Sequence, residues 1–368
     1  MITTLRTWYR RYFSDPEAII LGVLLLVSTL VVVYFGRMLA PVLASLVIAF
    51  LLEGLVRLLQ RLRLPRLAAV WLVFTLFMAV LLLVLFGLLP LLSQQLTQLV
   101  GELPGMVANG QKMLMQLPER YPQLVSIEQL AQINASVRSE IAALGQSLLS
   151  YSLASIVGLL TLLVYLVLLP LLVFFFLKDK EQIVAWLKRY LPRQRGLANR
   201  VWADVEIQIA NYVRGKFVEI LAVWVVTYTT FALMGLRYAM MLSVAVGLSV
   251  IIPYVGAVVV TLPIVLVAFF QWGLAPEFYY VVIAYLVIQA LDGNVLVPLL
   301  FSEVVNLHPI AIIVAVLFFG GIWGLWGVFF AIPLATLVQA VMSAWPRLDD
   351  GDEAAGGTTP APATPGGP

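Results

Sequence analysis

The chain has 368 residues, of which 62% are hydrophobic and 11% are charged, and its net charge is +3. Because a soluble domain carries about 25% charged residues, this composition excludes a water-soluble globular protein and predicts an all-α, polytopic membrane protein. The chain has no cysteine and one histidine. These counts exclude disulfides and thiolate metal sites, and we expect no metal, no cofactor and no enzymatic activity.

Apolar windows of about 20 residues mark the membrane segments. Residues 1–17 contain an arginine cluster and are predicted to form a cytoplasmic N-terminus that leads into an uncleaved anchor. The next 75 residues, 18–92, hold three predicted spans. These are 18–35, 38–56 and 67–92, with a tight turn at Gly36–Arg37 between the first two.

A long polar stretch with few cations, 93–150, follows the third span and is predicted to be an extracytoplasmic helical segment. Its leucines recur every three or four residues, which predicts amphipathic helices that extend the third and fourth spans. The alternative is a surface for an oligomeric or other partner. Residues 151–177 form the fourth predicted span.

Residues 178–212 are rich in Lys and Arg and are predicted to be cytoplasmic amphipathic helices, the first of which ends at Pro192. Basic helices of this kind lie on anionic lipid surfaces; a regulatory lever is the alternative. Basic loops after the second and fourth spans place both termini in the cytoplasm. The Pro/Gly-rich tail, 347–368, is predicted to be disordered.

The C-terminal region, 213–346, contains two oversized apolar blocks, 239–270 and 309–343, which alternate with ordinary spans. A straight helix through the first block would measure about 48 Å, whereas the hydrocarbon core is about 30 Å thick. Each block is interrupted near its middle. Either each block is one long kinked span, or it is a re-entrant hairpin of two half-helices. Counting both blocks, about eight membrane segments are expected.

The interruptions contain the residues that least suit a membrane helix. The first is "PYVG", with Pro253, Tyr254 and Gly256, and the second is "GGIWGLWG", with Gly324 and Gly327. Shifting the chain by 71 residues superimposes the two glycines 256 and 327, which indicates an internal repeat unless the match is a coincidence of apolar composition. Non-helical backbone at membrane depth needs protein or water around it, so the breaks predict a polar pathway; kinks that only improve packing are the alternative.

Asp292 lies near the middle of the span 277–300, where a carboxylate costs about 2.5–3.5 kcal/mol. Gly293, Asn294 and Pro298 follow it. A carboxylate at this depth predicts a ligand for a cation, a proton or a polar solute. The alternative is a structural pair with Arg214 or Arg237.

Other polar residues carry weaker predictions. Glu219 lies one helical turn after Lys216, which predicts an ion pair or snorkelling at the membrane interface. Glu53 and Arg57 are predicted to form a surface pair of little energetic value. His308 precedes a proline and is predicted to cap a helix or to sense protons.

Several stretches resemble the AI-2E (autoinducer-2 exporter, or PerM-like) family of transporters. They are "FFFLKDKEQI" at 174–183, "YVRGKFVE" at 212–219, "IIPYVGAVVVTLP" at 251–263, "DGNVLVPLLFSEVVNLHPIAII" at 292–313 and "GVFFAIPL" at 327–334. The resemblance implies an inner-membrane homo-oligomer in the form of a pentameric ring, with an elevator-like moving part in the C-terminal half. It also implies a pathway role for Pro253, Tyr254, Gly256, Asp292, Asn294, Pro298 and His308.

Three functions remain open at this point. The first is secondary transport, with export of a small polar organic solute that resembles autoinducer-2 and is coupled to an ion. The second is sodium/proton antiport with Asp292 as the ion ligand, and the third is a membrane scaffold that transports nothing. The sequence contains no Walker motif, so ATP coupling is not expected, and neither is a nucleic-acid partner.

Overall fold

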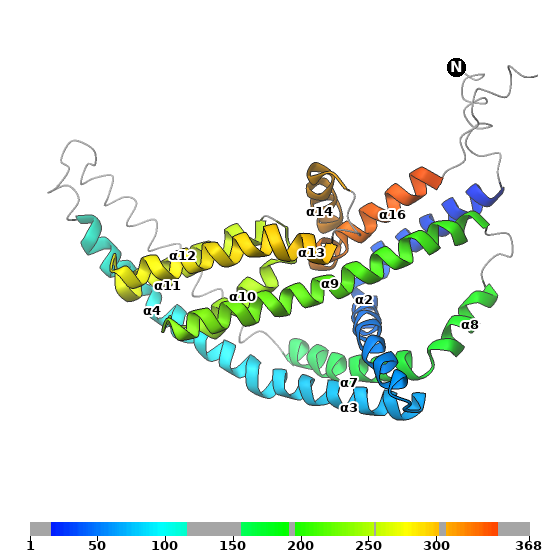
Figure 1. The fold of residues 1–368 in the computed structure, drawn as a ribbon, viewed down its shortest axis with the longest axis horizontal. Coiled ribbons are helices and arrows are strands. Elements are labelled where there is room, and N and C mark those ends of the chain that lie inside the picture. Colours follow the sequence, from blue (N-terminus) through cyan, green and yellow to red (C-terminus); the bar gives the residue numbers. More distant parts are fainter. Residues whose placement is uncertain (1–15, 116–155, 191–195, 254, 302–306, 345–368) are drawn as a thin grey trace, which may run out of the picture.

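The computed structural model describes residues 16–115, 156–190, 196–253, 255–301 and 307–344, and the regular elements in these ranges are all helices (Figure 1). Six stretches are long and apolar enough to cross a membrane, and four shorter apolar helices accompany them. The chain is therefore a polytopic all-helical membrane protein. Tyr254, the N-terminal residues 1–15, the part of the 93–150 segment beyond Met115 and the predicted disordered tail lie outside the described residues.

The described elements follow one another along the chain as helices. The first six are α2 (Pro16–Arg61), α3 (Arg66–Leu83), the π-helical turn η1 (Val84–Leu88), α4 (Leu89–Met115), α7 (Ile156–Lys178) and α8 (Lys180–Tyr190). The others are α9 (Gly196–Leu233), α10 (Ala239–Ser249), α11 (Val255–Trp272), α12 (Pro276–Leu291), the π-helical turn η2 (Asp292–Leu296), α13 (Val297–Phe301), α14 (Pro309–Trp323), α15 (Leu325–Phe329) and α16 (Ala331–Ala344).

Helix α2 is continuous, so the predicted turn at Gly36–Arg37 is wrong. It has 46 residues and contains Pro41, and it bends between its two halves (Figure 1). Proline removes a backbone donor and tends to kink a helix. In α2 it accompanies a bend but does not end the helix. The hydroxyl of Ser45 donates to the carbonyl oxygen of Pro41 at 2.6 Å. The chain thus joins its first two crossing stretches through a bent helix.

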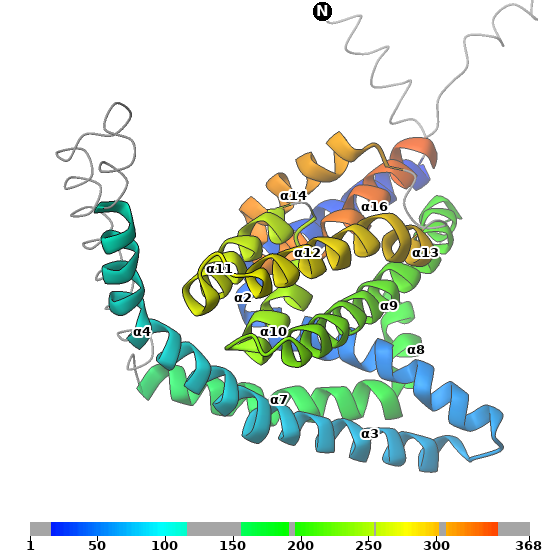
Figure 2. The same cartoon turned by 60° about the vertical axis from the view of Figure 1, so that its left-hand side comes forward.

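Helices α2, α3 and α7 pack as one group, with α3 and α7 side by side in both views (Figures 1 and 2). Their shared core is built from small and β-branched residues such as Ala49, Val56, Ala69, Val70 and Val173. Glu53 is buried at this contact and lies near Arg57, Arg66 and Lys180. The predicted pair of Glu53 with Arg57 is therefore present, but its surface character is wrong, because Glu53 is buried and two further helices bring cations to the same carboxylate.

Helix α9 is a single helix of 38 residues, where the sequence predicted a cytoplasmic amphipathic helix followed by a separate span beginning at residue 213. Its first turn is capped from another helix, because the backbone N–H groups of Gly196 and Leu197 donate to the carboxylate of Glu17 at 3.1 and 2.8 Å. A carboxylate at a helix N-terminus satisfies free donors and complements the helix dipole.

The block 239–270 is a helical hairpin of two half-helices and not one long kinked helix. Helices α10 and α11 fold back on each other (Figure 2). At the open end of the hairpin, Gln271 donates to the carbonyl oxygen of Gly235 and accepts from the backbone N–H of Arg237, both at 2.8 Å. The 11 residues of α10 span only about 16 Å, which is too short to cross a hydrocarbon core.

The block 309–343 also reverses direction at its break. Gly324 has φ 60° and ψ −135°, a conformation that only glycine adopts readily. On either side of it, a Cβ at Gly320 would lie 2.8 Å from Cγ2 of Val328, and a Cβ at Gly327 would overlap the carbonyl oxygen of Phe319. After Phe330 the chain continues as α16, which packs against α9 and the start of α2.

The two hairpins share one packing device. A Cβ at Gly256 would overlap the carbonyl oxygen of Ser249, the last residue of α10, and a Cβ at Gly327 would overlap that of Phe319, four residues before the end of α14. In both places glycine lets the second half-helix start close against a carbonyl group of the first. The two glycines that a shift of 71 residues superimposes therefore occupy equivalent positions.

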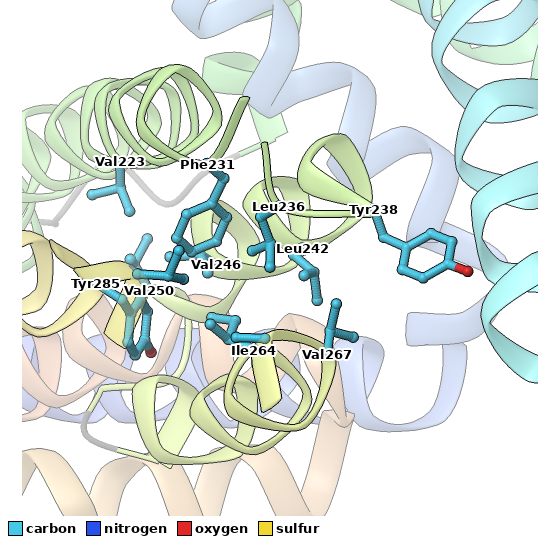
Figure 3. Packing of buried hydrophobic residues seen from close by; sticks show 12 residues of the cluster. Val223, Phe231, Leu236, Tyr238, Leu242, Val246, Val250, Ile264, Val267 and Tyr285 are labelled. Carbon is cyan, nitrogen blue, oxygen red and sulfur yellow. The ribbon is translucent and has the colours of Figure 1, made fainter. Parts of the chain in front are cut away.

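The largest buried cluster lies between the first hairpin, α9 and α12 (Figure 3). Val246 and Leu242 of α10 face Ile264 and Val267 of α11, and Tyr285 of α12 lies beside them. This core fixes the hairpin against α9 and α12 and thereby positions the hairpin tip.

Candidate functional site

A cavity of about 520 Å³ lies at the tip of the first hairpin. Its walls come from α9, from the tip between α10 and α11, from α12 through α13, and from the second broken block. The polar groups on these walls belong to Tyr212, Lys216, Glu219, Ser249, Gln289 and Asp292. A cavity of this size with a few convergent polar groups is typical of a small-molecule site.

One wall carries a buried ion pair on α9. The ammonium of Lys216 is 2.7 Å from a carboxylate oxygen of Glu219, and their side chains are 6% and 2% exposed. The same ammonium donates to the carbonyl oxygen of Val250 at 2.8 Å and lies 5.4 Å from the ring centre of Phe301. Since Val250 follows the last turn of α10, Lys216 satisfies one of the carbonyl groups that the helix end leaves free.

The hairpin tip forms the second wall. Ser249, Val250, Ile252, Pro253 and Ala257 line the cavity there. The backbone N–H of Gly256 donates to the carbonyl oxygen of Ile252 at 2.9 Å, which starts α11. The half-helix ends thus expose oriented backbone groups beside the cavity.

Asp292 stands on the third wall, at the start of the π-helical turn η2. π-Helical turns often occur at functional sites. Its Oδ1 atom is buried, and none of the described residues gives it a hydrogen-bond partner. A buried acceptor without a partner costs free energy, so this oxygen is a place where a bound donor or cation would be stabilised.

A chain of hydrogen bonds behind the cavity ties α12 to α11. The side-chain amide of Gln289 donates to the hydroxyl of Tyr285 at 2.7 Å, and that hydroxyl donates to the carbonyl oxygen of Ala257 at 3.0 Å. Thr261 lies 3.0 Å from the same hydroxyl. Gln289 and Ala257 both line the cavity, so the network holds two of its walls together.

Seven of the predicted pathway residues either line the cavity or build the hairpins. Pro253, Asp292, Gly293 and Pro298 line the cavity. Gly256, Gly324 and Gly327 build the hairpins instead.

Two other predicted residues do not line the cavity. The side chain of Asn294 donates back to the carbonyl oxygen of Ala290 at 2.8 Å. His308 is exposed and caps α14, since its Nδ1 accepts from the backbone N–H of Ile310.

The sequence suggested Arg214 or Arg237 as a partner of Asp292, but both arginines contact other residues. Arg214 lies over the ring of Phe50, 4.9 Å from its centre, and Arg237 is 3.6 Å from Glu102. Among the described residues, neither arginine pairs with Asp292. Glu219 pairs with Lys216 in the buried cavity wall rather than at an interface.

Sequence reasoning missed the importance of Tyr212, Lys216 and Ser249. The available signal was the lysine and glutamate three residues apart at the start of the apolar half of α9, a spacing that places both on one face. Within the described residues, no group of three or more His, Cys, Asp or Glu side chains could hold a metal ion.

A polytopic helical protein with a polar cavity walled by interrupted helices has the architecture of a membrane transporter. The family model for AI-2E family transporters matches residues 20–347. The chain therefore belongs to the AI-2E transporter family, which is a family of transporters and not of enzymes.

Individual relatives agree with this assignment. The chain is 50% identical to the Escherichia coli protein named "Putative permease PerM" over 346 residues, which cover 94% of this chain and 98% of the relative. It is 27% identical to "Putative transport protein YueF" of Bacillus subtilis over 84% of each chain. It is 24% identical to "AI-2 transport protein TqsA" of Escherichia coli over 88% of this chain and 92% of the relative.

Proposed function

We propose that this protein is a secondary transporter that carries a small polar organic solute, similar to autoinducer-2, through the cavity at the first hairpin tip. The observation that carries the proposal is Asp292, a residue that lines this cavity and whose buried Oδ1 has no hydrogen-bond partner among the described residues. Intramembrane carboxylates are costly and usually serve binding or conduction. A hydroxyl group of a polar solute would supply the missing donor.

The hairpins support this function. Broken helices that bring backbone groups to a polar cavity form the substrate sites of many transporters. Pro253 and Gly293 line the cavity directly, and Gly256, Gly324 and Gly327 allow the chain to reverse. We assign Asn294 and His308 to the approaches of the pathway rather than to its centre, and we also propose a pathway role for Tyr254.

The cellular setting belongs to the same proposal. We place the protein in the inner membrane with both termini in the cytoplasm, and we propose export as the direction of transport. We also propose that it is a homo-oligomer, with the five copies that the family resemblance implies. The ion pairs of Glu219 with Lys216 and of Arg237 with Glu102 would keep the walls of the pathway in place.

Proteoliposomes that contain the full chain test the proposal. We expect uptake of labelled autoinducer-2 by wild-type vesicles and a loss on the order of tenfold or more for Asp292→Asn, because a hydrogen bond to a charged group contributes about 1.5–3 kcal/mol. The matched control is Glu277→Gln, which removes an exposed carboxylate from the first turn of the same helix. Equal transport by Asp292→Asn and wild type, or no transport by wild type, as a scaffold would show, contradicts the proposal.

A second candidate is cation/proton antiport, because an unpartnered carboxylate oxygen also suits a sodium ion or a proton. Everted membrane vesicles with a pH-sensitive dye distinguish the two functions. Antiport requires sodium-dependent proton movement that Asp292→Asn abolishes, whereas solute transport without sodium coupling gives no such signal.

A further inference from the structure

A charged cluster outside the cavity lies where α2 and α7 end and α3 begins (Figure 1). Oε1 of Glu53 is 3.6 Å from Nε of Arg57, 3.6 Å from a guanidinium nitrogen of Arg66 and 3.3 Å from Nζ of Lys180. The Glu53 side chain is 8% exposed, whereas those of the three cations are 59%, 31% and 41% exposed. One buried carboxylate therefore holds three cations that still face the surroundings.

Positive charge is in excess around Glu53. The segments 57–66 and 178–180 together carry six Lys and Arg residues. The facing carboxylates are Glu53, Asp179, which is 3.9 Å from Lys178, and Glu181, which is 4.0 Å from Arg66. The six cations thus outnumber these three carboxylates by three, and they lie at the ends of membrane helices, where lipid headgroups are found.

Helix α8 begins at this cluster and has an exposed apolar face. None of its residues is buried, and it projects away from the helix group in Figure 1. The rings of Trp186 and Tyr190 lie 5.0 Å apart on one side, with exposures of 58% and 72%. By the helical periodicity, Lys188 falls on the opposite side of the helix and Arg189 on its flank. Aromatic and basic faces on one short helix are typical of helices that lie in a membrane interface.

We infer that α8 and the Glu53 cluster together form a docking surface for anionic phospholipid headgroups. The cations would bind the phosphate oxygens with charge-assisted hydrogen bonds, and the aromatic face of α8 would enter the boundary between headgroups and acyl chains. That apolar face favours a lipid over a soluble phosphate, which would use the cations alone. The inference is independent of the transported solute.

Lipid selectivity in bilayers tests this docking surface. The chain has no cysteine, so Val184→Cys on α8 gives a single attachment site for a fluorescent label. The full chain is reconstituted in phosphatidylcholine that contains brominated phosphatidylglycerol or, at the same mole fraction, brominated phosphatidylcholine. We expect brominated phosphatidylglycerol to quench the label more strongly, and equal quenching by the two lipids would overturn the inference.

Charge variants identify the groups responsible. Arg57→Gln with Lys180→Gln should weaken the preference for phosphatidylglycerol by roughly thirtyfold, since each cation near a membrane surface contributes about a fivefold change in affinity. The control Arg200→Gln removes an exposed cation from α9 and should leave the preference unchanged. An excess of inorganic phosphate should not displace the lipid; displacement would indicate a site for a soluble anion and would overturn the inference.

Glu53→Gln separates lipid binding from structural support. This change removes the buried carboxylate that Arg57, Arg66 and Lys180 share, so thermal stability should fall, whereas the preference for phosphatidylglycerol should be kept or increased. A cluster with a structural role alone would show no lipid preference to keep. Loss of the preference in a folded Glu53→Gln protein would overturn the inference.

Discussion

The ammonium of Lys216 lies 2.8 Å from the carbonyl oxygen of Val250 and thereby joins the middle of α9 to the tip of the first hairpin. The same ammonium is 2.7 Å from Glu219, so one cation serves both a buried carboxylate and the carbonyl end of a helix. This contact fixes the tip at the edge of the cavity. The stability of the tip therefore depends on a charge that lies on a different helix.

Lys216→Met should destabilise the folded protein by about 3–5 kcal/mol, because it leaves Glu219 buried without its partner. Chemical unfolding in detergent, followed by tryptophan fluorescence, measures the change. The double variant Lys216→Met, Glu219→Leu should recover much of this loss, since it removes both charges together. If the free energy of unfolding of Lys216→Met lies within about 1 kcal/mol of the wild-type value, the pair is not buried.

Gly256→Ala and Gly327→Ala should both disrupt their hairpins, because each new Cβ would overlap a backbone carbonyl oxygen. We expect losses of about 1–3 kcal/mol or more, as for other overpacking changes, in thermal unfolding of the purified protein. Gly321→Ala is the matched control, since a Cβ there meets nothing within 4 Å. Alanine at 321 should leave stability unchanged or slightly higher. A tolerated alanine at 256 or 327 would contradict the shared packing device.

Gln95→Ala should loosen the start of α10. The side chain of Gln95 on α4 accepts from the backbone N–H of Met241 at 2.9 Å, whereas the N-cap residue Tyr238 makes no side-chain cap. Loss of a cap costs about 1 kcal/mol. Hydrogen exchange should become faster in the first turn of α10 and stay unchanged in α12. Gln94→Ala, at the exposed neighbouring position, is the control.

Tyr285→Phe should destabilise the contact between α11 and α12 by about 1–3 kcal/mol, because it leaves the amide of Gln289 and the carbonyl oxygen of Ala257 without their shared hydroxyl. Thermal unfolding measures the loss, and Tyr280→Phe, on the exposed side of α12, is the control. If both variants unfold at the wild-type temperature, the hydrogen-bond chain does not hold the cavity walls together.

Composition and apolar windows were sufficient to predict a polytopic helical protein and two interrupted blocks near the C-terminus. The breaks were predictable because Pro253 and Gly256 oppose a regular helix by elementary backbone chemistry. The choice between a kink and a hairpin was not, since residues 238–302 contain no Lys or Arg and the charge rule had nothing to count. The hairpin depends on long-range contacts such as that of Gln271 with Gly235.

The candidate site was predictable only in part. Asp292 was found because a carboxylate inside an apolar span is conspicuous on its own. Lys216 was given an interfacial role because its partners, the carbonyl oxygen of Val250 and the ring of Phe301, are brought to it by folding. Likewise, the predicted boundary near residue 213 followed the change from polar to apolar residues, yet α9 crosses it without a break because both parts have helical periodicity.

The continuity of α9 has a mechanical consequence. Its 38 residues make a rod of about 57 Å, whose first turn is held by Glu17 and whose middle carries Lys216. A stiff rod transmits displacement along its length, so a shift at the start of the chain would reach the hairpin tip as a lever movement. Helices α2 and α16, the first and the last of the described helices, both pack against α9. They would then set the position of α9 before any such shift.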